Sequence, residues 1–151
     1  MEIERKFLVK YIPEYLEKYP KKEIEQSYIS TDPTIRLRKS NTSFILTVKG
    51  KGTIAREEFE LELSEKQYLS LIKKIETPIL VKTRYLIPLE SGYTAELDIY
   101  KGELEGLTTV EVEFPTVKEA ENFIPPIWFS SDISTDNRYK NTNLSLNGIP
   151  K

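Results

Sequence analysis

Hydrophobic and polar residues alternate with a period of two along much of the chain. This alternation is typical of a β-strand with one apolar and one polar face, because successive side chains of a strand point to opposite faces. Eight runs show the pattern, at residues 2–9, 24–30, 34–38, 43–49, 55–63, 81–88, 93–100 and 108–114. The sequence therefore predicts an antiparallel meander of eight strands.

Four further segments carry helical signals, at residues 13–19, 64–76, 116–123 and near 137–146. Two of them open with a capping pattern, Ser64 with Gln67 and Thr116 with Glu119. The helix after Ser64 has an apolar stripe made of Tyr68, Leu71, Ile72 and Ile75. Because such a stripe must be covered, we expect it to pack on the sheet. The fold class is thus α+β, and residues 1–151 are expected to form one domain.

The polar faces of the predicted strands are almost entirely ionic. Glu2, Glu4 and Lys6 project to one side of the first run, and Ile3 and Phe7 project to the other. The same alternation gathers a larger set on the polar faces: Arg36, Arg38, Lys49, Arg56, Glu58, Glu60, Glu62, Lys82, Arg84, Glu96, Asp98, Glu111 and Glu113. One such face alone would most often be solvated. A set of this density indicates that the charges serve a ligand.

Eight strands are enough to close into a barrel, and closure would place one face of the sheet inside. The apolar helix stripe favours a barrel with helices packed outside and a charged, hydrated lumen. A lumen with both signs of charge is costly unless its charges are paired or bind something. Arg and Lys suit phosphate oxygens, and Glu pairs two residues apart on a strand suit a divalent cation. The pattern therefore predicts a complex of a metal with a polyphosphate.

Composition narrows the chemistry further. Cysteine and histidine are absent, which excludes thiol nucleophiles, disulfides, the usual zinc ligands and histidine proton shuttles. There are 22 Lys and Arg against 24 Asp and Glu, a net charge of −2, so the chain lacks the basic footprint of a nucleic-acid binder. No apolar run is long enough for a signal segment or a membrane span. We therefore expect a cytoplasmic protein without a membrane or nucleic-acid partner.

The opening Glu2-Ile3-Glu4-Arg5-Lys6 resembles the Glu-x-Glu-x-Lys signature of the CYTH superfamily, the triphosphate tunnel metalloenzymes. That motif alone is weak, but an ordered series extends the likeness over nearly the whole chain. The series is 26–28 (QSY), 36–38 (RLR), 47–50 (TVKG), 56–58 (REE), 82–84 (KTR), 96–98 (ELD), 111–114 (EVEF) and 136–141 (DNRYKN). The last motif is similar to that of small bacterial members, the tripolyphosphatases of clostridial type.

This resemblance implies an eight-stranded tunnel, a requirement for Mg²⁺ or Mn²⁺, and a small-molecule substrate with a linear triphosphate. The chain would be a monomer or a homodimer. The implied metal ligands are Glu2, Glu4, Glu111 and Glu113, supported by Glu60 or Asp98. The implied phosphate contacts are Lys6, Arg36, Arg38, Lys49, Arg56, Lys82 and Arg84, with Arg138 at the tunnel end. Tyr28 would lie beside Lys6. Glu4, Lys6 and Tyr28 would take part in catalysis, Glu4 as a candidate base and the other two by stabilising the scissile phosphoryl group.

Several alternatives stay open at this stage. Glu60, Glu62 and Lys82 could form ion pairs at the tunnel mouth, Arg138 could neutralise a carboxylate, and Tyr28 could lie at the edge of a core. We expect hydrolysis of the terminal phosphoryl group of inorganic tripolyphosphate. The other possible functions are an adenylyl cyclase or thiamine triphosphatase of the same fold, and a non-catalytic polyphosphate-binding module.

Overall fold

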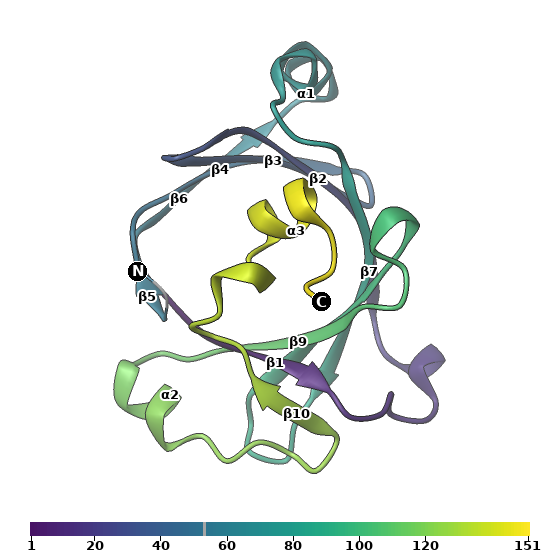
Figure 1. The fold of residues 1–151 in the computed structure, drawn as a ribbon, viewed down its shortest axis with the longest axis vertical. Helices are drawn as coiled ribbons and strands as arrows, with labels where there is room; N and C mark the ends of the chain where they lie inside the picture. Colours follow the sequence, from purple (N-terminus) through teal and green to yellow (C-terminus); the bar gives the residue numbers. More distant parts are fainter. Residues whose placement is uncertain (53) are drawn as a thin grey trace.

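The computed structural model describes residues 1–52 and 54–151. Its strands form one antiparallel sheet in the order β10-β1-β9-β8-β7-β2-β3-β4-β6. The strands are β1 (Glu2–Val9), β2 (Lys21–Thr31), β3 (Thr34–Ser40), β4 (Ser43–Lys49), β5 (Ala55–Arg56), β6 (Glu58–Leu63), β7 (Leu80–Pro88), β8 (Thr94–Tyr100), β9 (Thr108–Glu113) and β10 (Phe129–Asp132). Figure 1 shows the sheet curled into a ring around a central lumen.

The two ends of the sheet meet through β5. Glu57 separates β5 from β6, and β5 pairs with the beginning of β1 through Glu2 opposite Arg56 and Ile3 opposite Ala55. The backbone N–H of Glu4 also donates to the carbonyl of Ile54, at 3.0 Å. These few contacts bring β6 and β1 together, so the predicted barrel is confirmed as a nearly closed one.

Every predicted run contains a strand, but the expected number of eight needs correction. Among the residues that the structure describes, the run at 55–63 is divided into β5 and β6, and β10 is an additional strand. In β10 only Phe129 is buried, and the three residues after it are exposed, so its sequence does not alternate. It forms because Phe129 and Asp132 pair with Val9 and Phe7 of β1, a contact between distant segments that local patterning cannot indicate.

Two helices cover parts of the apolar outer face of the barrel, as predicted, while Phe59 and Leu61 of β6 stay 59% and 49% exposed. Helix α1 (Glu65–Leu71) begins with the expected capping box, in which Ser64 Oγ accepts from the Gln67 N–H. Its Tyr68 packs on Leu37 and Leu63. Helix α2 (Val117–Asn122) begins at Thr116 and leads into the aromatic cluster on the other side of the barrel.

That aromatic cluster is the main hydrophobic core. Phe7, Leu97 and Val110, from three adjacent strands, are almost fully buried in it. The rings of Phe123 and Phe129 lie 6.1 and 5.0 Å from that of Phe7, between centroids. Burial of these side chains on the outer face fixes which residues point into the lumen, because the side chains of a strand alternate.

Helix α3 (Asn141–Asn147) differs from the expectation that all helices pack outside. It lies within the ring, together with a 3₁₀ turn at Asn137–Tyr139 (Figure 1). Leu144 of α3 is buried in a separate cluster with Leu80, Tyr100, Leu104 and Leu107. The Tyr100 hydroxyl donates to Asn141 Oδ1 at 2.7 Å. One end of the lumen is thus apolar, which provides a surface for this helix.

The remaining 3₁₀ turns are Leu16–Lys18, Ile72–Lys74 and Gly102–Leu104. The segment 13–19, predicted as a helix, contains only the turn Leu16–Lys18. In the segment 64–76, helix α1 ends at Leu71 and the turn Ile72–Lys74 follows it. Among the described residues, no helix has the length and hydropathy needed to span a membrane.

The docking of α3 can be tested with two leucines of the same helix. Leu144→Ala removes a side chain that is 1% exposed, and we expect it to lower the free energy of unfolding by about 2–5 kcal/mol. Leu146→Ala, at a position that is 51% exposed, should change it by less than about 0.5 kcal/mol. Urea denaturation measures both. Equal small effects would mean that α3 is not packed in the lumen.

Candidate functional site

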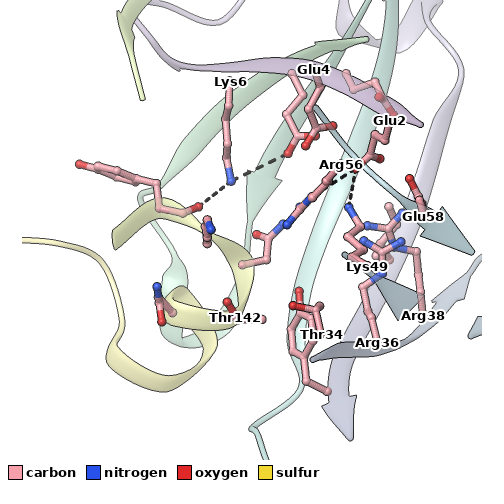
Figure 2. Close-up of a pocket in the computed structure, with 18 of the residues that line it drawn as sticks. Glu2, Glu4, Lys6, Thr34, Arg36, Arg38, Lys49, Arg56, Glu58 and Thr142 are labelled. Atoms are coloured by element: carbon pink, nitrogen blue, oxygen red, sulfur yellow. Dashed lines mark hydrogen bonds and ion pairs between the residues drawn. The ribbon is translucent and has the colours of Figure 1, made fainter. Parts of the chain in front are cut away.

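The lumen holds a cavity of about 520 Å³, within the usual size range of small-molecule sites. Most of the predicted site residues line it. The acids among them are Glu2, Glu4, Glu60, Glu111 and Glu113, and the bases are Lys6, Arg36, Arg38, Lys49, Arg56 and Arg84. Figure 2 shows several of them pointing into the cavity from different strands. Tyr28 also lines it.

Three carboxylates gather on one wall of the cavity. Glu2, Glu4 and Glu113 each offer an oxygen, and these oxygens lie within 4.8 Å of one another. The pairing of β1 with β9 places Glu4 directly opposite Glu113, and β1 alternation adds Glu2 on the same face. Three carboxylate oxygens are hard ligands of the kind that Mg²⁺, Mn²⁺ and Ca²⁺ prefer. The residues present therefore fit a divalent cation.

The pKa values of Glu4 and Glu113 are both raised, which indicates negative charge that the protein does not neutralise. Burial, together with the neighbouring charges of Glu111 and Glu2, raises the pKa of Glu4 well above its usual range. Burial and the charges of Glu96 and Glu2 also raise the pKa of Glu113. A bound cation would relieve this repulsion and favour the charged forms.

Glu111 has a different environment, although it shares the lumen face with Glu113. Its carboxylate lies 3.9 Å from Lys6 Nζ, and its side chain is 10% exposed. Burial opposes ionisation, but the positive charges of Lys6 and Arg84 outweigh it and hold the pKa of Glu111 well below its usual range. Glu111 is therefore already compensated by protein cations, and its assignment as a metal ligand stays a prediction.

A second acidic pair lies where β5 and β6 approach β1. Lys49 Nζ contacts Glu2 Oε1 at 2.9 Å, and Arg56 Nε is 3.7 Å from the same oxygen. Burial and a hydrogen bond with Glu2 raise the pKa of Glu58 to about 8. Burial acts against ionisation of Glu2 too, but the Glu58 hydrogen bond and the Lys49 charge lower its pKa. Near neutral pH the protonated form of Glu58 and the charged form of Glu2 are therefore favoured.

Arginines gather on the opposite wall. Arg38 donates to Gln26 Oε1 through Nε and Nη2, at 3.2 and 2.9 Å. Arg36 Nη2 donates to Thr47 Oγ1 at 3.2 Å, and the buried Arg36 Nε has no partner among the described residues. Burial and the charges of Arg36 and Arg84 lower the pKa of Arg38 to about 9. An excess of buried positive charge with an unused donor is an environment suited to an anion.

Tyr28 lies with these arginines instead of beside Lys6. Its hydroxyl accepts a hydrogen bond from Gln26 Nε2 at 3.0 Å, and Gln26 in turn binds Arg38. Lys6 Nζ donates to the Tyr139 carbonyl at 2.7 Å. The Lys6 backbone N–H donates to Ser134 Oγ at 2.9 Å. The C-terminal segment thus fixes Lys6.

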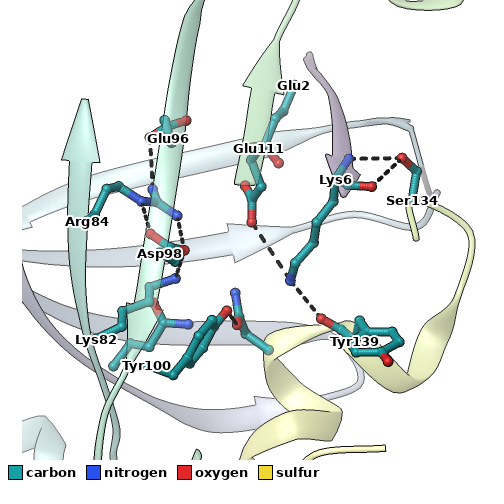
Figure 3. Close-up of polar contacts among 12 residues, drawn as sticks. Glu2, Lys6, Lys82, Arg84, Glu96, Asp98, Tyr100, Glu111, Ser134 and Tyr139 are labelled. Atoms are coloured by element: carbon teal, nitrogen blue, oxygen red, sulfur yellow. Dashed lines mark hydrogen bonds and ion pairs between the residues drawn. The ribbon is translucent and has the colours of Figure 1, made fainter. Parts of the chain in front are cut away.

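Three predicted residues lie outside the cavity lining. Lys82 and Asp98 are fully buried beside Arg84, and their charged groups lie 2.8 Å apart (Figure 3). The Arg138 side chain is 62% exposed and pairs with Asp136, at 2.7 Å. This pairing agrees with the alternative in which Arg138 neutralises a carboxylate.

Sequence reasoning also missed residues that line the cavity. Glu58 and Glu96 line the cavity but are absent from the predicted site, although strand alternation already places both on ionic faces. The C-terminal segment adds Asp136, Asn137, Tyr139, Lys140, Asn141, Thr142 and Asn143. No periodic signal could place these in a lumen, because they reach it through the tertiary path of the chain.

The proton on Glu58 leads to a prediction about stability. Since the pKa of Glu58 is raised from 4.5 to about 8 on folding, the folded state holds the extra proton between these values. Its stabilising contribution is complete below about pH 4.5 and is lost as the pH rises through 8. In EDTA, Glu58→Gln should therefore gain stability relative to wild type between pH 5 and 9, measured by thermal unfolding. The exposed Glu62 supplies the control Glu62→Gln, and a constant Glu58→Gln difference would contradict the assignment.

Comparison with known proteins gives the family. The model of the CYTH domain matches residues 1–124. An inorganic triphosphatase of Nitrosomonas europaea is 40% identical over 150 residues, which cover 96% of this chain and 97% of that protein. An inorganic triphosphatase of Acetivibrio thermocellus is 37% identical over 126 residues, with coverage of 81% and 79%. A crystal structure of an inorganic triphosphatase superposes with a TM-score of 0.72 at 37% identity, over 100% of this chain and 97% of that one. The chain belongs to the CYTH family.

Proposed function

We propose that this protein is a metal-dependent triphosphatase that hydrolyses the terminal phosphoryl group of inorganic tripolyphosphate inside its barrel. The observation that carries the proposal is the presence of two opposed walls in one cavity. One wall has the crowded carboxylates of Glu2, Glu4 and Glu113, and the other has Arg36 and Arg38. A metal–triphosphate complex has the charges that both walls lack. The two inorganic triphosphatases that match most of this chain support the same activity.

Mg²⁺ or Mn²⁺ would be held by Glu2, Glu4 and Glu113. When bound, such an ion neutralises charge on the phosphates and polarises their P–O bonds. The basic residues hold the triphosphate in one register, and Arg36 has an unused Nε–H for a phosphate oxygen. Because phosphoryl transfer needs mainly positioning and charge stabilisation, these contacts supply most of the catalysis.

Hydrolysis adds water to the terminal phosphorus and breaks its bridging P–O bond, giving orthophosphate and pyrophosphate. Glu4 is the candidate proton acceptor, because its carboxylate lies on the cavity wall beside the position where the ion would be held. Lys6 lies two residues further on the same face of β1 and can stabilise charge on the scissile group. Tyr28 would support the arginine wall, because Gln26 donates to its hydroxyl and accepts from Arg38.

A bare triphosphate fits the cavity better than a nucleotide. Charged and polar side chains dominate its lining, and the apolar residues among them are Ile24, Ile45 and Ile133, with Tyr28 and Tyr139. Tyr28 is 3% exposed, which leaves little ring surface for a base to stack on. A purely anion-binding module is disfavoured because the carboxylate wall would repel its ligand in the absence of a metal.

A substrate panel with phosphate detection tests this proposal. Tripolyphosphate with Mg²⁺ or Mn²⁺ should give orthophosphate and pyrophosphate, faster than ATP does. EDTA should abolish the reaction, and added Mg²⁺ or Mn²⁺ should restore it. Full turnover in EDTA, or formation of cyclic AMP and pyrophosphate from ATP as the main reaction, would refute it.

Two glutamates of β9 should respond to substitution in opposite ways. Glu113→Gln keeps the size of an uncompensated carboxylate and removes its charge, so hydrolysis should fall by orders of magnitude with little change in stability. Glu111→Gln removes the carboxylate that forms the ion pair with the buried Lys6 and should destabilise the fold by about 3–5 kcal/mol. Urea unfolding without metal and phosphate release with metal measure both effects. A destabilised Glu113→Gln that retains full activity would place Glu113 in the scaffold.

A further inference from the structure

Lys82 and Asp98 are ionic residues that the cavity does not reach. Both side chains are 0% exposed, whereas the neighbouring Arg84 is 8% exposed and lines the cavity. Pairing of β7 with β8 places Arg84 opposite Asp98, and Lys82 opposite Tyr100. Figure 3 shows the three side chains next to one another, with Asp98 between Arg84 and Lys82. A fully buried charge is stable only when an opposite charge lies beside it. The contacts among Lys82, Arg84 and Asp98 therefore indicate what Lys82 and Asp98 do.

Asp98 fixes Arg84 through a two-point contact. Arg84 Nε donates to Asp98 Oδ1 at 2.7 Å, and Arg84 Nη2 donates to Oδ2 at 2.8 Å. A third bond runs from Arg84 Nη1 to Glu96 Oε2, at 2.9 Å. A guanidinium has five N–H groups, and three are engaged here, so two remain for a ligand. The bidentate contact also prevents rotation of the guanidinium plane.

Lys82 in turn fixes Asp98. Its ammonium lies 2.8 Å from Asp98 Oδ2, the oxygen that Arg84 Nη2 also contacts, and 5.5 Å from the centroid of the Tyr100 ring. The contact with Asp98 is an ion pair, and the ammonium makes no hydrogen bond of good geometry to any described residue. Because Lys82 is 0% exposed and does not line the cavity, its ammonium would have to leave Asp98 to reach a phosphate. Among the residues that the structure describes, its only short ionic contact is therefore with Asp98.

We propose that Lys82 and Asp98 are positioning residues that aim Arg84 at the bound triphosphate, and that Lys82 itself does not touch the substrate. This assignment replaces the roles that the family resemblance implied, a phosphate contact for Lys82 and metal support for Asp98. It rests on the proposed triphosphatase function for the identity of the ligand. The arrangement of the three side chains is independent of that function.

A double-mutant cycle separates positioning from direct contact. If Lys82 acts only through Arg84, Lys82→Met should lower kcat/KM for tripolyphosphate by roughly tenfold or more in the wild-type background. In an Arg84→Ala background, Lys82→Met should lower kcat/KM by less than about twofold, because Arg84, the residue that Lys82 positions, is gone. A similar fall in both backgrounds would show direct contact and overturn the proposal.

Lys49→Met provides the matched comparison. Lys49 lines the cavity and contacts Glu2, far along the sheet from Arg84. Lys49→Met should therefore lower kcat/KM by a similar factor in the wild-type and Arg84→Ala backgrounds. If Lys82→Met fails to fold, Lys82→Gln, which keeps a polar head group at this position, is measured in the same cycle with the same expected pattern.

A second measurement needs no activity. In metal-free protein, the Nε–H proton of Arg84, followed through its ¹H–¹⁵N NMR signal, should exchange with solvent slowly in wild type and faster in Lys82→Met. The exposed Arg138 should be unchanged. An Arg84 signal that is identical in the two proteins would overturn the positioning role. Wild-type protein that fails to hydrolyse tripolyphosphate would instead refute the proposed function, and the NMR comparison would still decide the role of Lys82.

Discussion

Charge compensation inside the barrel is the constraint on which the rest of this structure depends. Burial makes every lumen charge costly unless an opposite charge lies close to it. Lys49 compensates Glu2, Lys6 compensates Glu111, and Arg84 with Lys82 compensates Asp98. Compensation is incomplete in two places, at the carboxylates of Glu4 and Glu113 and at the guanidiniums of Arg36 and Arg38. These two places define where a cation and an anion would complete the site.

The same constraint explains the arrangement of the layers. Side-chain alternation sends the ionic residues inward only if the outer face is buried by something apolar, and α1, α2 and the aromatic cluster around Phe7 provide that cover. Helix α3 enters the lumen where the inward residues cease to be charged, next to Leu80 and Tyr100. The charged cavity and the apolar end are therefore two parts of one lumen. The boundary between them lies where the inward-facing residues of the strands change from charged to apolar.

Alternation predicted the face of a residue well but could not predict its depth. Lys49 and Lys82 both lie on ionic strand faces, and nothing in their local sequence distinguishes them. The structure places Lys49 at the cavity wall and Lys82 fully buried beside Arg84, because depth depends on which strands are neighbours and on the side chains packed around each residue. The same limit applies to Glu111 and Glu113, two residues apart on β9, one compensated and one not. Contributions of the C-terminal segment, such as the Tyr139 carbonyl on Lys6, had no periodic signal at all.

The carboxylate wall of Glu2, Glu4 and Glu113 is incomplete without a divalent cation. Anomalous diffraction from crystals soaked in Mn²⁺ tests it most directly, since it locates the ion without any assumption about activity. The account predicts a strong peak between the carboxylates of Glu2, Glu4 and Glu113, and loss of that peak in Glu113→Gln. The absence of a peak there, or a peak only at surface carboxylates such as Glu62, would contradict it.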